Sequence, residues 1–476
     1  MKTLENKLNT LKKFFNNNET FIVRQFNAFN TKMALCYFEE FVKFPEVSHA
    51  ILEPLVSATG SVNPKDFNKF ILEKVLFATD AKEVATFSEI KNAIMDGFVI
   101  MLVDGQDGAI KINAINTYKR SITEPSSSSV IRGPREGFIE DVNINISLLK
   151  KRLKTEKLKI DNFIVGEMTR TRVAVLYLNG IASKKIVKEI ESIIKKIKID
   201  GVIDSYYIQA YLARRPGSIF RQCGVSEKPD IIAAKVLEGR VAILVDGSPA
   251  VLTLPFLLIE DLQSSEDYYE NHIKVSLVRI LRVLGIFLAV VMPGVYISFQ
   301  VFHYEALPLN FLVTILSGSS KVPFTPTLEM LFVFLMFEIL FEASVRIPQN
   351  LGSSLNIIGA LILGDTAVKS SLASAPSIMV VALSSIALYL IPDQTNVMRI
   401  IRVGFIIAGS IMGIVGIVIT LIFLVAYLCD FDSFQSAYLA PISPMVKDDL
   451  KDAVTKSHIS KMKTRPKSYL VKRKER

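Results

Sequence analysis

The sequence predicts an α+β protein in two parts: a cytosolic half built from two α/β subdomains, followed by a polytopic α-helical membrane half. Val403 to Cys429 is a run of 27 residues without Asp, Glu, Lys or Arg, and Val283 to Phe302 is a second run of 20. About 20 apolar residues in a helix cross a hydrocarbon core of roughly 30 Å. In lipid a helix satisfies its own backbone hydrogen bonds, so both runs are predicted to be helices.

The composition supports a division into a soluble and a membrane half. The 476 residues have a mean hydropathy of +0.36 but only 50% hydrophobic residues, and most of the charge lies in residues 1–270. The first residues are polar and contain no apolar core of a signal peptide, so we expect the amino-terminal half to stay in the cytosol.

Neither metal binding nor catalysis is expected. Cys36, Cys223 and Cys429 form no C-x-x-C pair, and the four histidines are scattered. The sequence has no Walker A loop, G-x-G-x-x-G, H-E-x-x-H or G-x-S-x-G motif. We therefore predict no enzyme activity and no cofactor.

The carboxyl-terminal tail is basic. Residues 447–476 hold 11 Lys and Arg against 4 Asp and Glu. Nucleic acid is one partner for such a tail, but the positive-inside rule favours a cytosolic tail, 431–476, near anionic headgroups. Membrane lipid is therefore the expected partner, and nucleic acid is not.

Residues 1–125 form the first predicted subdomain. Residues 1–93 are expected to be mostly helical, since Thr31–Phe44 and Asp66–Thr79 have apolar residues at helical spacing. A strand then ends in the turn Asp104-Gly105.

Residues 130–270, after the linker Ser126–Ser129, form the second predicted subdomain. Its strands end at Asn179-Gly180 and Asp246-Gly247, and Ile146–Lys157 and Ser183–Lys198 are predicted basic helices with solvated lysines. The similar strands before Gly105 and Gly247 indicate two related subdomains, although any buried strand before a tight turn shows this pattern.

Residues 275–430 are the predicted membrane domain of four to five embedded segments. Pro293-Gly294 should kink the first span, and residues 306–320 are too short to cross unaided. The five candidate segments are 280–302, 329–347, 347–364, 370–392 and 403–429. Two cytosolic ends require an even number of crossings, so one segment, within 347–392, should be re-entrant or broken.

Charges within these segments are candidate functional residues, because charge inside a membrane is costly. Glu338, Glu342 and Arg346 share one helix face, and Asp365 precedes Lys369 by four residues. They either line an ion or substrate path or neutralise one another at a helix interface. Pairing is favoured for Glu342 with Arg346, which lie near a membrane boundary. Glu338 lies deeper, lacks a partner at i+3 and is favoured as functional.

A stripe of small residues provides the candidate pore lining. In a helix, one face would present Gly352, Asn356, Gly359, Ala360 and Leu363. Such a stripe favours close helix packing, and it also fits a narrow pore between symmetric copies, closed by an apolar ring. A second face, with Gly409, Gly413 and Gly416, indicates helix packing only.

A series of ordered motifs runs through about residues 125–450. The segments are, in order, 133–141, 228–230, 237–249, 265–269, 293–297, 342–348, 356–364 and 438–444. The most distinctive element is Gly133-Pro-Arg-Glu-Gly-Phe138. With these motifs the sequence resembles the A subunits of GerA-type spore germination receptors, although Lys228 stands where that family often has Arg.

The resemblance implies a receptor subunit in the inner membrane of a spore, with its soluble domain on the core side. It also implies a permease-like B subunit and a lipoprotein C subunit as partners, nutrient binding by the B subunit, and a homo-oligomeric, ligand-gated cation channel formed by the A subunit. The alternatives are a secondary transporter, suited by Glu338 and the broken helices of 347–392, and a non-conducting signalling scaffold.

Overall fold

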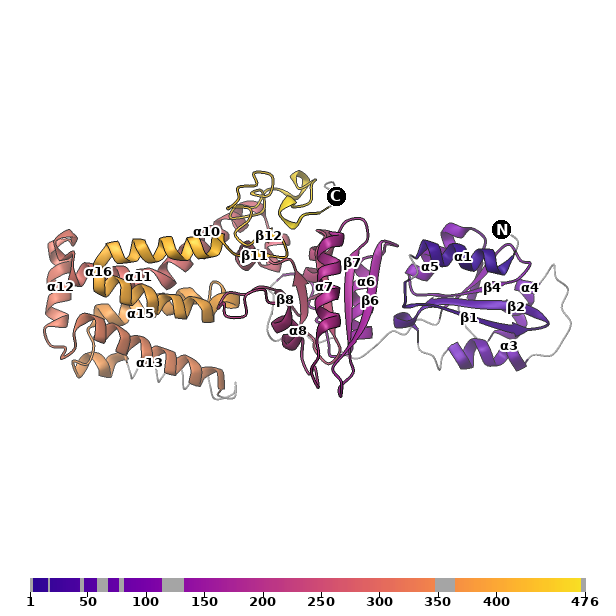
Figure 1. Ribbon diagram of the computed structural model, residues 1–476, viewed down its shortest axis with the longest axis horizontal. Helices are drawn as coiled ribbons and strands as arrows, with labels where there is room; N and C mark the ends of the chain where they lie inside the picture. Colours follow the sequence, from indigo (N-terminus) through magenta and orange to yellow (C-terminus); the bar gives the residue numbers. More distant parts are fainter. Residues whose placement is uncertain are drawn as a thin grey trace.

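A computed structural model describes residues 3–15, 18–42, 47–57, 67–76, 81–113, 132–346 and 364–471. Figure 1 shows an amino-terminal α/β unit, a second α/β unit and a helical part, one after another along the molecule. The fold class predicted from the sequence is therefore confirmed: two mixed α/β units precede a helical carboxyl-terminal half.

The first unit is an antiparallel sheet with strand order β1-β2-β4-β5-β3. Its strands are β1 (Phe21–Ala28), β2 (Thr31–Phe38), β3 (Ala81–Val84), β4 (Val99–Val103) and β5 (Ala109–Ile112). Its helices are α1 (Leu4–Phe14), α3 (Glu53–Ser57), α4 (Phe67–Phe70) and α5 (Phe87–Met95). Helices α1 and α5 pack on one face of the sheet, and α3 and α4 pack on the other.

The helix predicted over Thr31–Phe44 is wrong, since its first part is strand β2 and residues 43–46 lie outside the described ranges. Both faces of β2 are buried, with Met33 and Leu35 in one core and Ala34 and Cys36 in the other. The resulting continuous apolar run hides the two-residue period of a strand. The mostly helical character expected for residues 1–93 is also wrong, since β1 and β3 are strands as well.

The second unit repeats the topology of the first, with strand order β6-β7-β9-β10-β8. Its strands are β6 (Leu158–Val165), β7 (Thr171–Leu178), β8 (Gly224–Ser226), β9 (Val241–Val245) and β10 (Val251–Leu254). Helices α6 (Val142–Arg152) and α9 (Pro229–Leu237) cover one face, and α7 (Lys184–Lys196) and α8 (Ser205–Leu212) cover the other. Strands β4 and β9, which precede Asp104-Gly105 and Asp246-Gly247, are equivalent, so the two subdomains are related as predicted.

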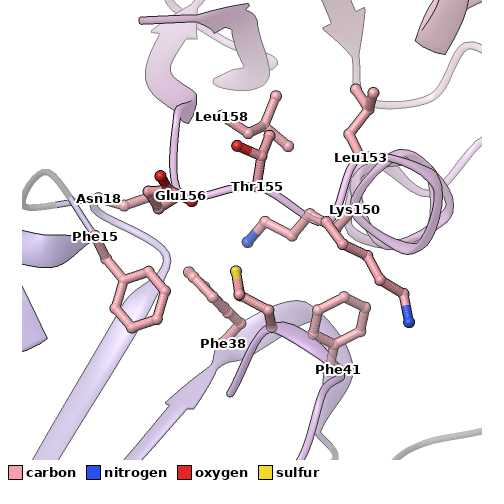
Figure 2. Close-up of a pocket in the computed structure, with 11 residues that line it drawn as sticks. Phe15, Asn18, Phe38, Phe41, Lys150, Leu153, Thr155, Glu156 and Leu158 are labelled. Atoms are coloured by element: carbon pink, nitrogen blue, oxygen red, sulfur yellow. The ribbon is translucent and has the colours of Figure 1, made fainter. Parts of the chain in front are cut away.

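A buried ion pair joins the two units. Lys150 Nζ of α6 lies 2.9 Å from Glu40 Oε2, donates to Thr20 Oγ1 and lies 3.7 Å from the centre of the Phe38 ring. Figure 2 shows Lys150 and Phe38 beside a cavity between the units, which has a volume of about 20 Å³. Burial lowers the pKa of Lys150, and Glu40 opposes this effect. The lysine was expected on a solvated face, but in the folded chain it fills the contact between units.

The helical part contains α10 (His272–Val290), α11 (Met292–Val301), α12 (Leu309–Ser319), α13 (Pro326–Arg346), α15 (Ala375–Leu388) and α16 (Thr395–Cys429). Helices α10 and α11 meet at 45°, and Pro293 lies in the first turn of α11. The predicted kink at Pro293-Gly294 is therefore confirmed. Gly294 also allows close packing, because a Cβ there would lie 2.5 Å from the carbonyl oxygen of Phe405.

Within the described residues, the stretch Pro392–Cys429 is long and apolar enough to cross a membrane by length and composition, and so is the bent pair α10–α11 taken together. Only 22% of the most apolar window of Pro392–Cys429 is buried. Large side chains such as Ile411 and Phe423 are exposed. An exposed apolar surface of this extent favours contact with lipid over contact with water.

Helix α16 is a hairpin of two antiparallel arms. Asp393, just before the helix, lies 3.4 Å from Arg221, and Tyr427, near the other end of the helix, packs on Phe220. Because Phe220 and Arg221 are adjacent in the chain, the two ends of α16 lie close together. A straight helix of its 35 residues would separate its ends by about 52 Å. The reversal lies at Gly413, with φ 63° and ψ −143°. The single span predicted over 403–429 is therefore wrong: the arms are 395–412 and 414–429.

Replacing Gly413 should destabilise this hairpin. An L side chain at its φ and ψ is strained by about 1–3 kcal/mol, and a Cβ there would lie 3.0 Å from His303 Nε2. We expect Gly413→Ala to lower the thermal unfolding midpoint of the solubilised full-length chain. Gly404→Ala is the control, since its Cβ meets nothing within 4 Å in the same helix. Equal midpoints for both variants would contradict the hairpin geometry.

Candidate functional site

A buried charge cluster joins helices α13, α15 and α16. Arg402 of α16 is 1% exposed and donates through Nη2 to Glu338 Oε1 of α13 at 3.0 Å. Its Nη1 donates to Ser384 Oγ of α15 at 2.7 Å, and Ser384 Oγ donates to the carbonyl oxygen of Ala289 in α10 at 2.7 Å. Arg399 Nε lies 3.5 Å from the second Glu338 oxygen. One carboxylate and two guanidinium groups thus link α13, α15 and α16, and the Ser384 hydroxyl extends the link to α10.

The surroundings of this cluster are a mixture of aromatic and polar groups. The Arg402 guanidinium lies 4.1 Å from the centre of the Phe334 ring, and the Arg399 guanidinium lies 3.6 Å from the centre of the Phe341 ring. A cavity of about 190 Å³ lies beside Glu338 and Arg399 and is also lined by hydroxyl groups. Those hydroxyl groups belong to Ser344, Ser385, Tyr389 and Thr395. The site is polar enough to hold water next to the charges.

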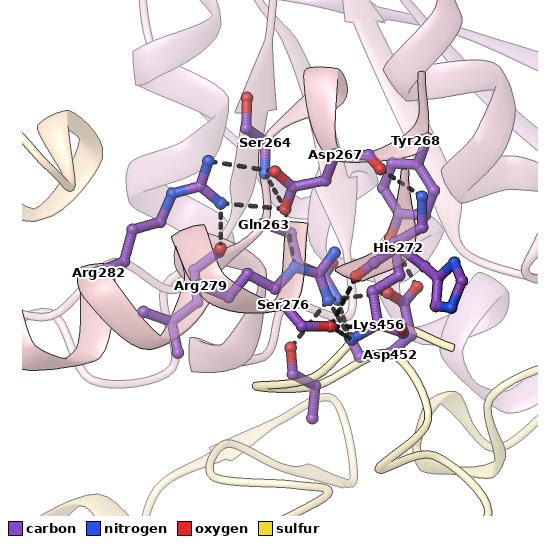
Figure 3. Close-up of polar contacts among 12 residues, drawn as sticks. Gln263, Ser264, Asp267, Tyr268, His272, Ser276, Arg279, Arg282, Asp452 and Lys456 are labelled. Carbon is purple, nitrogen blue, oxygen red and sulfur yellow. Dashed lines mark hydrogen bonds and ion pairs between the residues drawn. The ribbon is translucent and has the colours of Figure 1, made fainter. Parts of the chain in front are cut away.

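A second charge cluster fixes the start of α10 to the α/β half and to the tail. Arg279 is fully buried and donates through Nε to Asp267 Oδ2 at 2.8 Å and through Nη1 to Asp452 Oδ1 at 2.9 Å. Arg282, one turn later, donates to both oxygens of Asp267. Figure 3 shows Arg279 between the two carboxylates, with Tyr268 OH donating to Asp452. Segments from residues 264–282 and 452–456 therefore meet at one point.

A third cluster lies in the same region, where the second α/β unit, the start of α10 and the tail meet; we call this region the joint. Glu260 Oε2 lies 2.6 Å from Arg240 Nη1 and 2.9 Å from Lys235 Nζ. Burial alone would raise the pKa of Glu260, but Arg240 and Lys235 outweigh it and hold the pKa below its usual range. Tyr469 of the tail accepts a hydrogen bond from Arg240. The tail, expected near headgroups, is in its described part folded against the second α/β unit.

Asp261 provides a pH-dependent contact in this joint. Its side chain is 4% exposed, and it accepts a hydrogen bond from Gln394, next to the start of α16, and lies 3.5 Å from Arg221. Burial raises the pKa of Asp261 to about 7, and Arg221 only partly opposes the rise.

The stability of the chain should therefore fall as pH rises through this range. A raised pKa in the folded state means that the stabilisation is complete below the unfolded value near 3.9 and is lost as pH passes about 7. We expect the free energy of unfolding to decrease from about pH 5 to 8, by at most about 1.4 kcal/mol per pH unit. Asp261→Asn should flatten this slope in denaturant titrations, and Asp430→Asn, at an exposed carboxylate, should not. An unchanged slope in Asp261→Asn would refute the assignment.

The other predicted charges form exposed pairs. Arg346 donates to Glu342 at 2.6 Å and Lys369 to Asp365 at 2.6 Å, each on its own helix. Glu342 and Arg346 thus pair with each other, as expected. Glu338, in contrast, has a partner after all, from a helix 64 residues away in the chain.

The five candidate pore-lining residues, Gly352, Asn356, Gly359, Ala360 and Leu363, lie outside the described residues. Sequence analysis missed Arg402 and Ser384. The available signal was Arg399-Ile-Ile-Arg402, where two arginines lie one turn apart at the edge of an apolar run. Only the folded chain reveals which acid they meet.

The segment 133–138 packs in the second unit. Gly133 has φ +125°, and a Cβ there would lie 2.8 Å from the Tyr269 ring. Glu136 accepts a hydrogen bond from Arg152 at 2.6 Å. Nearby, Lys228 precedes the first turn of α9 and is fully buried. The segment is therefore a turn that positions α6 and the connector 257–269 against each other.

Comparisons with known proteins agree over nearly the whole chain. The family model for "Bacillus/Clostridium GerA spore germination protein" matches residues 9–468. The chain is 35% identical to the "Uncharacterized membrane protein YfkQ" of Bacillus subtilis (strain 168), covering 94% of this chain and 88% of the relative. It is 35% identical to "Spore germination protein KA" (89% and 78%) and 32% identical to "Spore germination protein B1" (97% and 96%) of the same organism.

A solved structure is also similar to part of the chain. It is the N-terminal domain of the A subunit of the Bacillus megaterium spore germinant receptor GerK3, with a TM-score of 0.41 and 24% identity over 54% of this chain and 96% of that one. The family match agrees with the resemblance found from the sequence. So do the relatives named above, each of which this chain covers over more than two thirds of its length. The chain therefore belongs to the GerA family of spore germination proteins.

Proposed function

We propose that this chain is the A subunit of a spore germination receptor and that several copies form a nutrient-gated cation channel. The soluble half then lies on the core side of the spore's inner membrane. A permease-like B subunit and a lipoprotein C subunit are the proposed partners, and the B subunit binds the nutrient. Family membership supports the germination role, and the exposed apolar surface of α16 supports the membrane position.

The observation that carries the channel proposal is a series of buried charge contacts leading from the α/β half into the helical bundle. The series begins where Asp267 binds Arg279 of α10. Further along α10, Ala289 accepts from Ser384, which accepts from Arg402, the partner of Glu338 in α13. Helix α13 ends at Arg346, six residues before Gly352, the first candidate pore residue, in the sequence. A shift of the α/β half can therefore bias the position of α13.

The proposed gate is a ring of side chains near Leu363, contributed by symmetric copies. In this mechanism, partner subunits move the soluble half, the charge series displaces α13, and the small residues that follow it along the chain widen the ring. Cations then pass along the small, mildly polar stripe. The charge pairs hold helices in position and are not themselves the conduction path, since Glu338 is neutralised by two arginines.

Ion flux through the assembled receptor tests this proposal. The full-length chain and its partner subunits are reconstituted in liposomes, and cation efflux is recorded after nutrient addition. Large side chains in Gly359→Phe and Ala360→Phe should abolish nutrient-triggered efflux. Ile411→Phe, at an exposed apolar position of α16, is the matched control and should conduct normally.

Two results would overturn the channel. One is the absence of any nutrient-dependent conductance in a receptor whose subunits co-purify. The other is normal efflux in both Gly359→Phe and Ala360→Phe. Saturable solute uptake by this chain alone would instead favour a transporter.

A further inference from the structure

Helix α8 (Ser205–Leu212) carries a stripe of exposed tyrosines. Ile203, Tyr206, Tyr207 and Tyr211 are all exposed, with Ile203 at 71% and Tyr206 at 67%. Positions 206, 207, 210 and 211 lie on one face of α8, and Ile203 stands just before the helix. The opposite face of α8 packs through Ile208 and Leu212 into the second unit. Three tyrosines on one exposed face are a surface that soluble proteins rarely leave uncovered.

The chain that follows α8 is attached to the end of α16. Arg215 Nη2 donates to Asp430 Oδ2 at 2.6 Å, and Arg214 Nη1 lies 3.3 Å from Asp432. The Phe220 and Tyr427 rings lie 6.0 Å apart. The second arm of α16, and with it the apolar stretch of this helix, ends at this point. The stripe therefore belongs to a segment that is held close to the level where the membrane surface begins.

Helix α7, next to α8 on the same face of the sheet (Figure 1), adds positive charge. Its apolar side, including Ile186 and Ile190, is buried against the sheet. Exposed lysines lie along the rest of α7 and just beyond it, at positions 184, 185, 188, 195, 196 and 198. Tyrosines are the side chains that settle at lipid headgroups, and lysines are attracted to anionic lipid.

We propose that α7 and α8 form a membrane-contacting surface on the second α/β unit, whose partner is the anionic lipid headgroup layer around α16. The tyrosine stripe inserts into the headgroup region, and the lysines of α7 interact with lipid phosphates. Contact with the bilayer then orients the α/β half relative to the helices. This role adds to the proposed channel and does not depend on conduction.

The chain has no tryptophan, so single-tryptophan variants report local surroundings without background. The full-length chain is reconstituted in vesicles of phosphatidylcholine and phosphatidylglycerol, with bromine on the acyl chains near the headgroups. Tyr207→Trp and Tyr211→Trp should each show about half or more of the bromine quenching seen for Phe423→Trp, which reports the lipid-facing surface of α16. Met168→Trp, at an 81% exposed residue in the turn between β6 and β7, should show none.

Two outcomes overturn the proposal. If Tyr207→Trp and Tyr211→Trp are quenched by aqueous acrylamide but not by bromine, the stripe faces water. If they resist both quenchers, another protein surface covers the stripe, either a second copy or a partner subunit. Lys184→Gln, Lys185→Gln and Lys188→Gln combined should reduce bromine quenching of Tyr211→Trp in vesicles containing phosphatidylglycerol, and no reduction would remove the charge contribution. Because quenching needs no nutrient or ion flux, failure here is distinct from failure of the channel.

Discussion

Arg279→Ala should strongly destabilise the chain. The substitution leaves the buried carboxylate of Asp267 with Arg282 alone and removes the link to Asp452. Removing one partner of a buried ion pair costs about 3–5 kcal/mol, because the remaining charge stays desolvated. We expect a loss of this size in the unfolding free energy of the solubilised full-length chain, measured by denaturant titration.

The matched control for Arg279 is Arg346. Its pair with Glu342 is 78% and 60% exposed, so Arg346→Ala should change the unfolding free energy by less than about 1 kcal/mol. Arg279→Lys should fall between the two, since one ammonium cannot reach both carboxylates as the planar guanidinium does. Similar losses for Arg279→Ala and Arg346→Ala would show that the joint does not hold α10 to the α/β half.

Glu338→Leu should destabilise the helical bundle by a comparable amount. The substitution leaves Arg402, which is 1% exposed, and Arg399 without a carboxylate between the helices. We expect a loss of about 3–5 kcal/mol. Glu342→Leu, one turn further along the same helix and in an exposed pair, should have little effect.

A double-mutant cycle separates pairing from packing at Glu338. Glu338→Leu combined with Arg402→Leu removes both unlike charges, and paired removal of a buried ion pair is often nearly neutral. The double variant should therefore regain much of the loss, with a coupling energy of about 0.5–3 kcal/mol. Strictly additive losses would show that Glu338 and Arg402 do not stabilise each other and would remove a step of the series proposed to move α13.

The sequence predicted much of the candidate site but not its partners. The charged residues Glu338, Glu342 and Arg346 could be named because a charge in an apolar run is conspicuous. The exposed pair of Glu342 and Arg346 was also predictable, since residues four apart on a helix are neighbours. The contact of Glu338 with Arg402 was not, because nothing local in the chain brings together residues 64 positions apart.

Local structure was predictable where one pattern dominated and failed where two competed. Pro293 broke the helix as expected, because proline removes a backbone donor whatever its surroundings. The sequence of strand β2 predicts a helix, because burial on both faces of the sheet removes the alternation of apolar and polar residues. The run over 403–429 predicts one span, because a small residue such as Gly413 is typical of helix packing faces and its φ of 63° cannot be seen in the sequence.

The sequence by itself determined the division into an α/β half and an apolar helical half, the strand-ending turns and membership of the GerA family. Those properties depend on composition, short-range spacing and ordered motifs, which the linear chain contains. The tertiary structure decided which charges meet, that α16 reverses at Gly413 and that the tail folds back onto the joint. A buried ion pair or a chain reversal is stabilised only after distant segments of the chain have excluded water around it. Neither can therefore be recognised from residues that are neighbours in the sequence.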